Sequence, residues 1–317
     1  MEQRLTGVYT ALATPFRADG RIDEPSLRKL VDRQLEAGVA GLVPCGTTGE
    51  SAAMTTDEWE RTLAVVVEQT AGRVPVIAGA GSNQTAKAVD LSRRCARIGV
   101  NVLLQVTPYY VKPTQQGMID HYRAIADATD LPILLYNVPG RTGVTLAPET
   151  VLRLAESPSF VGIKQAVADL DQASAILRSR PRYFAVLSGE DSLALPMIAL
   201  GGDGVISVIS NQVPRSFAAL VQAALAGRRE EAAALHAKLF PLMRANFIES
   251  NPIPVKFTLA ELGLIENVLR TPLTPLSEAC RETVRAALRQ ACTAETACPA
   301  RNASAPDASG QPLCAGA

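Results

Sequence analysis

One of the six lysines in the chain stands in surroundings that set it apart from the others. Lys164 ends the apolar run Phe160-Val-Gly-Ile163, and the following Gln165-Ala166 brings no countercharge, whereas the other lysines have polar, helical or proline neighbours. An amine buried among apolar groups gives up its proton more readily than one in water, and it can then attack a carbonyl carbon. The alternative is a lysine at a strand end whose side chain extends into solvent. This stretch alone does not decide between the two.

Polar side chains also follow four other strand-like runs. They lie in Gly46-Thr-Thr-Gly-Glu-Ser51, Thr107-Pro-Tyr-Tyr110, Tyr136-Asn-Val-Pro-Gly-Arg-Thr142 and Ser188-Gly-Glu-Asp191. Each segment has a structural explanation, such as a turn with a helix cap, a half-exposed aromatic pair or a solvated loop charge. In a TIM barrel, however, the carboxyl ends of the strands meet on one face, and that face carries the chemistry. Their shared position favours a functional site.

The residue types at this face indicate one kind of reaction. A lysine amine and a keto acid form a Schiff base, which acidifies the neighbouring C–H bond and allows an enamine to form. With no histidine nearby, tyrosine and threonine hydroxyls are the candidates for proton transfer. Arg141 suits a carboxylate through paired hydrogen bonds, and the backbone N–H groups of Thr47-Thr48-Gly49 suit a second one. The residues predict a class I aldolase acting on a keto acid and a second carboxylate-bearing partner.

The elements that must position these residues alternate along the chain. Strands are predicted at 8–13, 41–45, 75–79, 101–106, 132–137, 160–164, 184–188 and 204–207, with amphipathic helices between them at 24–37, 56–70, 85–98 and 116–128. Most of the strands are apolar on both faces, which is typical of a parallel sheet covered by helices. A doubly wound sheet would carry GxGxxG after its first strand, and the chain lacks it there. The pattern predicts an α/β fold, a (β/α)8 TIM barrel.

The pattern becomes helical after residue 208, with segments predicted at 215–226, 229–247, 254–262 and 278–291. We therefore expect a barrel over residues 1–226 and a C-terminal helical appendix over 227–291. Residues 292–317 contain almost no large apolar side chains and are predicted to form a disordered tail.

The six cysteines are scattered without a CxxC pair, which predicts reduced thiols and neither a disulfide framework nor a zinc site.

Composition excludes several classes of partner. The formal net charge is zero and no cationic run exists, so the chain has no electrostatic reason to bind nucleic acid or an anionic membrane. No apolar stretch approaches the ~20 residues of a membrane span, and the N-terminus lacks a signal-peptide core, so a cytoplasmic protein is expected. Only two histidines occur, which argues against a histidine base and a histidine-rich metal site.

Six motifs occur in the order expected for a known family: GLVPCGTTGES, VTPYYVKPTQQG, YNVPGRTG, GIKQA, SGEDSLALPMIALGGDGVISV and ESNPIPVKFTLAELGL. Through them the chain resembles the dihydrodipicolinate synthase and N-acetylneuraminate lyase superfamily over about residues 4–291. Arg141 in YNVPGRTG points to the synthase branch. This resemblance implies condensation of pyruvate with L-aspartate 4-semialdehyde to 4-hydroxy-tetrahydrodipicolinate, in the diaminopimelate route to lysine, with no metal or organic cofactor.

The resemblance also assigns roles to single residues. Four would do the chemistry: Lys164 as the Schiff-base lysine, Tyr136 as the general acid/base, and Thr47 and Tyr110 as a proton relay. Four would bind substrate: Thr48 the pyruvate carboxylate, Arg141 the semialdehyde carboxylate, and Gly189 and Ile206 as the pocket lining. Tyr110 would come from the neighbouring subunit of a tight dimer, and two such dimers would form a homotetramer.

Two alternatives to the synthase stay open at this stage. One is a sibling pyruvate-dependent aldolase or dehydratase that acts on a sugar acid or a keto-deoxy acid through the same imine. The other is a non-catalytic barrel that binds a keto acid as a sensor. Arg141 argues against the first, and the presence of both Lys164 and Tyr136 argues against the second.

The chain departs from the family pattern in two places. Gln165 stands where glutamate is common, and we expect little effect on the reaction. In the pocket where sensitive members bind the feedback inhibitor lysine, Asn83 and Tyr109 match, but Lys87 stands where those members carry glutamate. Thr56 and Trp59 stand where histidines are common. A cation that faces the amine of the effector costs affinity, so the chain is expected to be insensitive to L-lysine.

Overall fold

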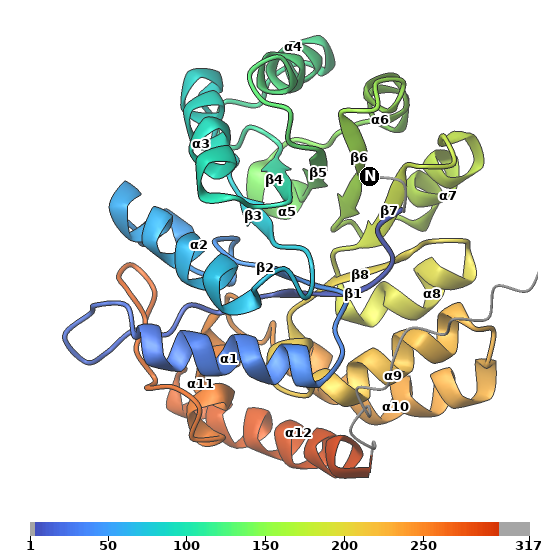
Figure 1. Ribbon diagram of the computed structural model, residues 1–317. Coiled ribbons are helices and arrows are strands. Elements are labelled where there is room, and N and C mark those ends of the chain that lie inside the picture. The colour runs from blue at the N-terminus through green and yellow to red at the C-terminus, as the bar shows by residue number, and fades with distance from the viewer. Residues whose placement is uncertain (1–3, 298–317) are drawn as a thin grey trace, which may run out of the picture.

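Eight parallel strands form a barrel in the computed structural model, which describes residues 4–297 (Figure 1). The strands are β1 (Gly7–Ala11), β2 (Gly41–Val43), β3 (Ile77–Gly79), β4 (Val102–Val106), β5 (Ile133–Asn137), β6 (Phe160–Gln165), β7 (Ala185–Ser188) and β8 (Gly204–Ser207). Their order is β2-β1-β8-β7-β6-β5-β4-β3. A parallel bridge between Leu42 and Val76 closes the ring. The predicted (β/α)8 barrel is confirmed, and each predicted strand is present.

Helices surround the barrel on the outside. They are α1 (Glu24–Glu36), α2 (Thr56–Thr70), α3 (Thr85–Ile98), α4 (Gln115–Ala126), α6 (Pro148–Ala155), α7 (Leu170–Ser179), α8 (Ala194–Ala199) and α9 (Pro214–Leu225). Local signals place their starts: Asp23 caps α1, and Thr55 with Glu58 forms a capping box on α2. Four short elements occupy the loops after β2, β5, β7 and β8: η1 (Ser51–Ala53), α5 (Pro139–Thr142), η2 (Asp191–Leu193) and η3 (Ile209–Asn211).

Three further helices follow the barrel: α10 (Arg229–Ala245), α11 (Ile253–Glu261) and α12 (Glu278–Ala297). They lie together with α9 on one side of the molecule, at the bottom of Figure 1.

Within the described residues, no helix has the length and hydropathy needed to cross a membrane. Nor do residues 4–297 bring together three or more His, Cys, Asp or Glu side chains that could hold a metal ion.

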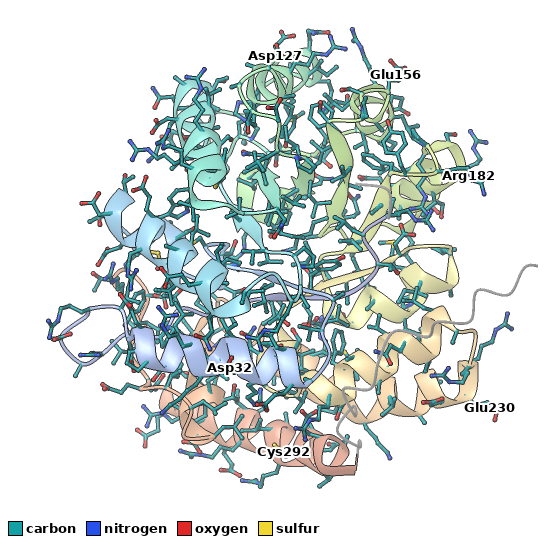
Figure 2. The ribbon with its side chains drawn as sticks, viewed as in Figure 1. Asp32, Asp127, Glu156, Arg182, Glu230 and Cys292 are labelled. Carbon is teal, nitrogen blue, oxygen red and sulfur yellow. The ribbon has the colours of Figure 1, made fainter. Side chains whose placement is uncertain are left out.

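Apolar side chains on the two faces of the strands form two cores. Those pointing inward fill the barrel, among them Tyr9, Ile77, Leu134 and Ile206. Those pointing outward pack against the helices in a larger cluster, and Figure 2 shows side chains filling this space while Asp127, Glu156 and Glu230 lie at the periphery. The inside of the barrel is therefore packed, and a ligand site must lie at its rim.

The C-terminal helix extends past its predicted end. We expected a helix to 291 and disorder from 292, but α12 continues to Ala297. Ala291 and Ala294 are buried, and the carboxylate of Glu295 accepts hydrogen bonds from the backbone N–H groups of Arg215 (3.1 Å) and Ser216 (2.8 Å). These contacts stabilise the additional turn. The sequence did not predict it, because the turn has no large apolar side chains that would indicate a buried core. The rest of the predicted tail, 298–317, lies outside the described residues.

Glu295 also satisfies the start of another helix. The N-cap residue of α9, Val213, provides no side-chain hydrogen bond to that helix. Glu295 supplies the missing acceptor from a distant part of the chain and accepts the Ser216 hydroxyl as well (2.9 Å). The last turn of α12 and the first turn of α9 thus stabilise each other.

Candidate active site

Lys164 and Tyr136 lie side by side at the carboxyl ends of neighbouring strands. They pair in register across β5 and β6, and the Nζ atom of Lys164 lies 4.2 Å from the centre of the Tyr136 ring. Each residue is 7% exposed. The lysine is therefore buried at the rim of the barrel, and the reading in which its side chain extends freely into solvent is wrong.

The charge of Lys164 has no close partner. Across the part of the chain that the structure describes, no carboxylate lies within 4.0 Å of its Nζ atom. Two acidic residues after β7 interact with it at longer range. Burial raises the pKa of Glu190 and of Asp191, and the positive charge of Lys164 opposes the rise at both. An amine without a bound carboxylate remains available to react with a ligand.

The turn after β2 is tightly folded. The N–H of Gly49 donates to the carbonyl of Gly46 (3.2 Å), and the N–H of Glu50 donates to that of Thr47 (3.1 Å). A side chain at Gly49 would place its Cβ atom 3.1 Å from the backbone of both Leu12 and Cys45, so a larger residue would require these neighbours to shift. Thr47 is half-buried and Thr48 is buried. The turn follows β2 at the carboxyl ends of the strands, and its role in binding a carboxylate stays a prediction.

Asn251 links this turn to Arg141. Its Nδ2 atom donates to the hydroxyl oxygen of Thr48 (3.0 Å), and its carbonyl accepts from the guanidinium of Arg141 (3.4 Å). The Oδ1 atom of Asn251 is buried and accepts no hydrogen bond from the described residues. The contacts of Asn251 could not be predicted from its neighbours in the sequence, although it belongs to the motif ESNPIPVKFTLAELGL, which carries the family resemblance.

Arg141 is exposed on α5 and forms no ion pair within residues 4–297. Apart from its hydrogen bond to the carbonyl of Asn251, its guanidinium is available to bind an anion from solution. Gly189 follows β7, the strand next to that of Lys164, and Ile206 lies in β8, the strand after it in the barrel. Ile206 is fully buried, and a Cβ atom at Gly189 would lie 2.5 Å from that of Ala166. The predicted lining residues therefore occupy the barrel end that carries Lys164.

Tyr110 differs from the other predicted site residues. It is 89% exposed, with Tyr109 at 40% and Val111 at 57%, and its φ of +72° lies in the left-handed region. No hydrogen bond joins the hydroxyls of Thr47, Tyr110 and Tyr136 to one another in the described chain. A single chain thus brings Tyr136 to Lys164 but does not assemble the predicted relay.

The two histidines lie in helices. His121 on α4 contacts the hydroxyl of Thr85 on α3 (2.9 Å), and burial lowers the pKa of His121 to about 4. Burial also lowers the pKa of His236 on α10. Neither residue follows a strand.

The five residues of the predicted lysine pocket differ in burial. Trp59 is buried, and its indole N–H donates to the carbonyl of Gly79 (3.0 Å). Thr56, Lys87 and Tyr109 are exposed, and Asn83 is half-buried. Lys87 forms no ion pair with the described residues, so its ammonium is not neutralised within the chain.

The chain matches known proteins over most of its length. A model of the dihydrodipicolinate synthetase family matches residues 4–291. The chain is 50% identical over 283 residues to a 4-hydroxy-tetrahydrodipicolinate synthase of Pelobacter propionicus (89% of this chain, 97% of the relative). It is 49% identical over 287 residues to that of Methylococcus capsulatus (90% and 99%).

Solved structures show the same similarity. The chloride-inhibited dihydrodipicolinate synthase of Acinetobacter baumannii, complexed with pyruvate, has a TM-score of 0.89 at 43% identity, with 90% of this chain and 99% of that chain covered. The enzyme of Cyanidioschyzon merolae with lysine bound has a TM-score of 0.89 at 40% identity (92% and 99%).

Proposed function

Since the chain belongs to the dihydrodipicolinate synthetase family, we propose that it is an enzyme that condenses pyruvate with L-aspartate 4-semialdehyde. The product is 4-hydroxy-tetrahydrodipicolinate, on the diaminopimelate route to lysine. The observation that carries the proposal is the buried Lys164 amine beside the Tyr136 ring, with two groups suited to carboxylates near the same rim. The pyruvate complex of the A. baumannii relative supports the choice of keto acid.

The roles of these residues give the reaction step by step. The amine of Lys164 attacks the keto carbon of pyruvate, and loss of water gives a protonated imine. Removal of a methyl proton yields the enamine, whose carbon attacks the aldehyde of the second substrate and forms the new carbon–carbon bond. The substrate amino group then attacks the imine carbon, which closes the ring and releases Lys164. Tyr136, with Thr47 and Tyr110, transfers the protons.

The carboxylates of the two substrates bind at different places. Thr48 and the N–H groups beside it bind the carboxylate of pyruvate. The hydroxyl oxygen of Thr48 accepts a hydrogen bond from Asn251, which leaves the hydroxyl proton of Thr48 to be donated to the ligand. Arg141 binds that of the semialdehyde through paired hydrogen bonds. Gly189 and Ile206 line the pocket between them.

We also propose a tight dimer, with two dimers forming a homotetramer. The support is the exposed segment Tyr109-Tyr110-Val111, which presents three large apolar side chains to solvent in the single chain. In the dimer, Tyr110 would enter the site of the neighbouring subunit and complete the relay.

The free thiols of Cys45 and Cys95 suit the reducing cytoplasm, where we propose that the enzyme acts.

The test is turnover of pyruvate plus L-aspartate 4-semialdehyde, coupled to a downstream reductase that consumes a nicotinamide cofactor. Robust turnover supports the synthase. A wild type that is silent, yet gains the mass of reduced pyruvate at Lys164 after borohydride treatment, would instead favour a sibling aldolase with another aldehyde. A wild type that gains no mass would favour the sensor.

Arg141→Ala is expected to lower kcat/KM for the semialdehyde roughly 100-fold, because a charge-assisted bidentate contact to its carboxylate is lost. Pyruvate trapping at Lys164 should persist, since Arg141 does not take part in imine formation. The measurement is steady-state kinetics with each substrate varied in turn. Arg153→Ala, which removes an arginine on α6, is the matched control. Unchanged kinetics in Arg141→Ala would assign the semialdehyde carboxylate to another group.

L-Lysine at millimolar concentration is expected to leave turnover nearly unchanged, because the exposed Lys87 ammonium repels the amine of the effector. The measurement is the initial rate across a lysine titration. Lys87→Glu is the informative variant, since it removes the repulsion and supplies a partner for the amine. Half-inhibition of the wild type at submillimolar lysine would contradict the prediction.

A further inference from the structure

A buried ion pair lies at the end of the turn that follows β2. The Nζ atom of Lys256, on α11, lies 2.6 Å from Oε1 of Glu50. The side chains are 0% and 1% exposed, respectively. Lys256 also donates to the carbonyl of Thr14 (3.0 Å) and lies 4.2 Å from the centre of the Phe16 ring. Burial lowers the pKa of Lys256, and the carboxylate of Glu50 opposes that change.

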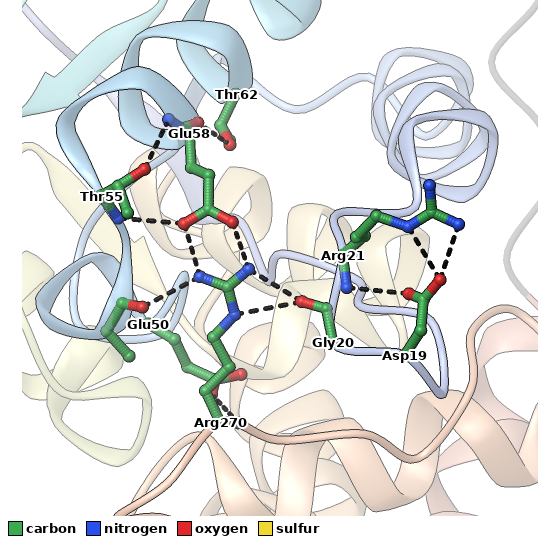
Figure 3. Close-up of polar contacts among 9 residues, drawn as sticks. Asp19, Gly20, Arg21, Glu50, Thr55, Glu58, Thr62 and Arg270 are labelled. Atoms are coloured by element: carbon green, nitrogen blue, oxygen red, sulfur yellow. Dashed lines mark hydrogen bonds and ion pairs between the residues drawn. The ribbon is translucent and has the colours of Figure 1, made fainter.

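Glu50 needs this support because of its backbone. Its φ of +54° and ψ of +33° lie in the left-handed region, which residues with a side chain seldom adopt. The second carboxylate oxygen of Glu50 accepts the backbone N–H of Arg270 (3.0 Å). Figure 3 shows Arg270 near Glu50, with its guanidinium bound to Glu58 and to the carbonyl of Gly20. Both carboxylate oxygens are therefore held by groups from the C-terminal part of the chain.

The same C-terminal segment contacts the turn at a second point. Asn251 precedes α11 and donates to the hydroxyl of Thr48, and Lys256 lies within that helix. Thr47 lies beside these two anchored residues, and Gly49 lies between them. The N–H groups of Thr47 and Thr48 are proposed to face the keto acid, whereas that of Gly49 donates to the carbonyl of Gly46. The charges of the pair do not reach the ligand themselves, because both side chains are buried and bound to each other.

We infer that Glu50 and Lys256 are positioning residues, which hold the Thr47–Thr48–Gly49 turn in the geometry that binds the carboxylate of the keto acid. The inference rests on the proposed function, since it takes pyruvate as the ligand of the turn. Removal of the pair should weaken pyruvate binding far more than it slows the later chemistry. Lys164 and Tyr136 lie on β6 and β5, and the described residues show no hydrogen bond or ion pair between them and the pair.

The decisive variant is the double substitution Glu50→Gln with Lys256→Met. Either single change leaves a buried group without its partner and can prevent folding, whereas the double change leaves no unpaired charge. We expect the double variant to fold and to require roughly tenfold more pyruvate for half-maximal borohydride trapping at Lys164, with a similar rise in KM for pyruvate and a smaller change in kcat.

The control is Asp203→Asn at the opposite end of the barrel. Asp203 is as buried as Glu50 and is paired with Arg4 (2.9 Å) and Arg180, so its loss also disrupts a buried charge cluster. It should reduce stability or the fraction of active enzyme without changing the pyruvate concentration at half-saturation. A double variant with half-saturation within twofold of the wild type would overturn the inference and leave the proposed function intact. Absence of trapping in the wild type would overturn the proposed function, and the inference with it.

Discussion

Lys164→Ala is expected to abolish turnover, with a loss of at least about 10⁴-fold in kcat/KM. Without the amine no imine forms, so the electron sink that acidifies the pyruvate methyl group is missing. Two other lysines lie near the carboxyl ends of the strands, but Lys112 is exposed against Gly143 and Lys256 is bound to Glu50, so neither is expected to replace Lys164. The measurements are coupled turnover and intact-protein mass after incubation with pyruvate and borohydride.

The matched control for this variant is Lys238→Ala, which removes an exposed lysine from α10. It should retain wild-type turnover and gain the mass of one reduced pyruvate, whereas Lys164→Ala should gain none. Trapping that survives in Lys164→Ala would show that another amine forms the imine, and the mechanism proposed above would then be wrong.

Tyr136→Phe is expected to lower kcat by roughly 10²- to 10⁴-fold, the usual contribution of a positioned general acid/base. Phenylalanine keeps the ring that lies 4.2 Å from the Lys164 Nζ atom, so the packing around the amine should persist. Imine formation should slow because proton transfer is impaired, but trapping should reach completion at long times. Rapid-quench trapping and steady-state kinetics measure the two effects separately.

Tyr122→Phe serves as the control for the loss of a buried hydroxyl. Tyr122 is fully buried on α4, and its hydroxyl donates only weakly to the carbonyl of Gln105 (3.4 Å). That variant should keep kcat within twofold of the wild type. A similarly small effect in Tyr136→Phe would reassign the acid/base role to another hydroxyl, with Thr47 as the next candidate.

Much of the fold was predictable because its signals are local. Continuous apolar runs such as 133–136 and 185–187 are typical of strands buried on both faces, and each lies where predicted. Caps such as Asp23 and Thr55 fix the starts of helices within one turn. The position of Lys164 was predictable for a related reason, since one charged residue at the end of an apolar run has few structural explanations.

The remainder of the site depends on contacts between distant residues. Asn251 meets Thr48, and Lys256 meets Glu50, across about two hundred residues of sequence. No periodicity or spacing links such partners, because the packing of α11 against the barrel alone brings them together. Tyr110 could not be placed in the site for a different reason. It is exposed in a single chain, and its predicted role requires a second copy of the protein.

The contact between Glu295 and α9 has a consequence for the evolution of the chain. The family model ends at residue 291, so Glu295 lies beyond the part that it describes. A terminal extension is ordinarily free to drift or to be deleted, because few groups depend on it. Here deletion would remove the acceptor of two backbone N–H groups and one hydroxyl at the start of a helix that lacks its own cap. Selection should therefore retain the extension as far as Glu295, unless Val213 is first replaced by a residue that caps α9.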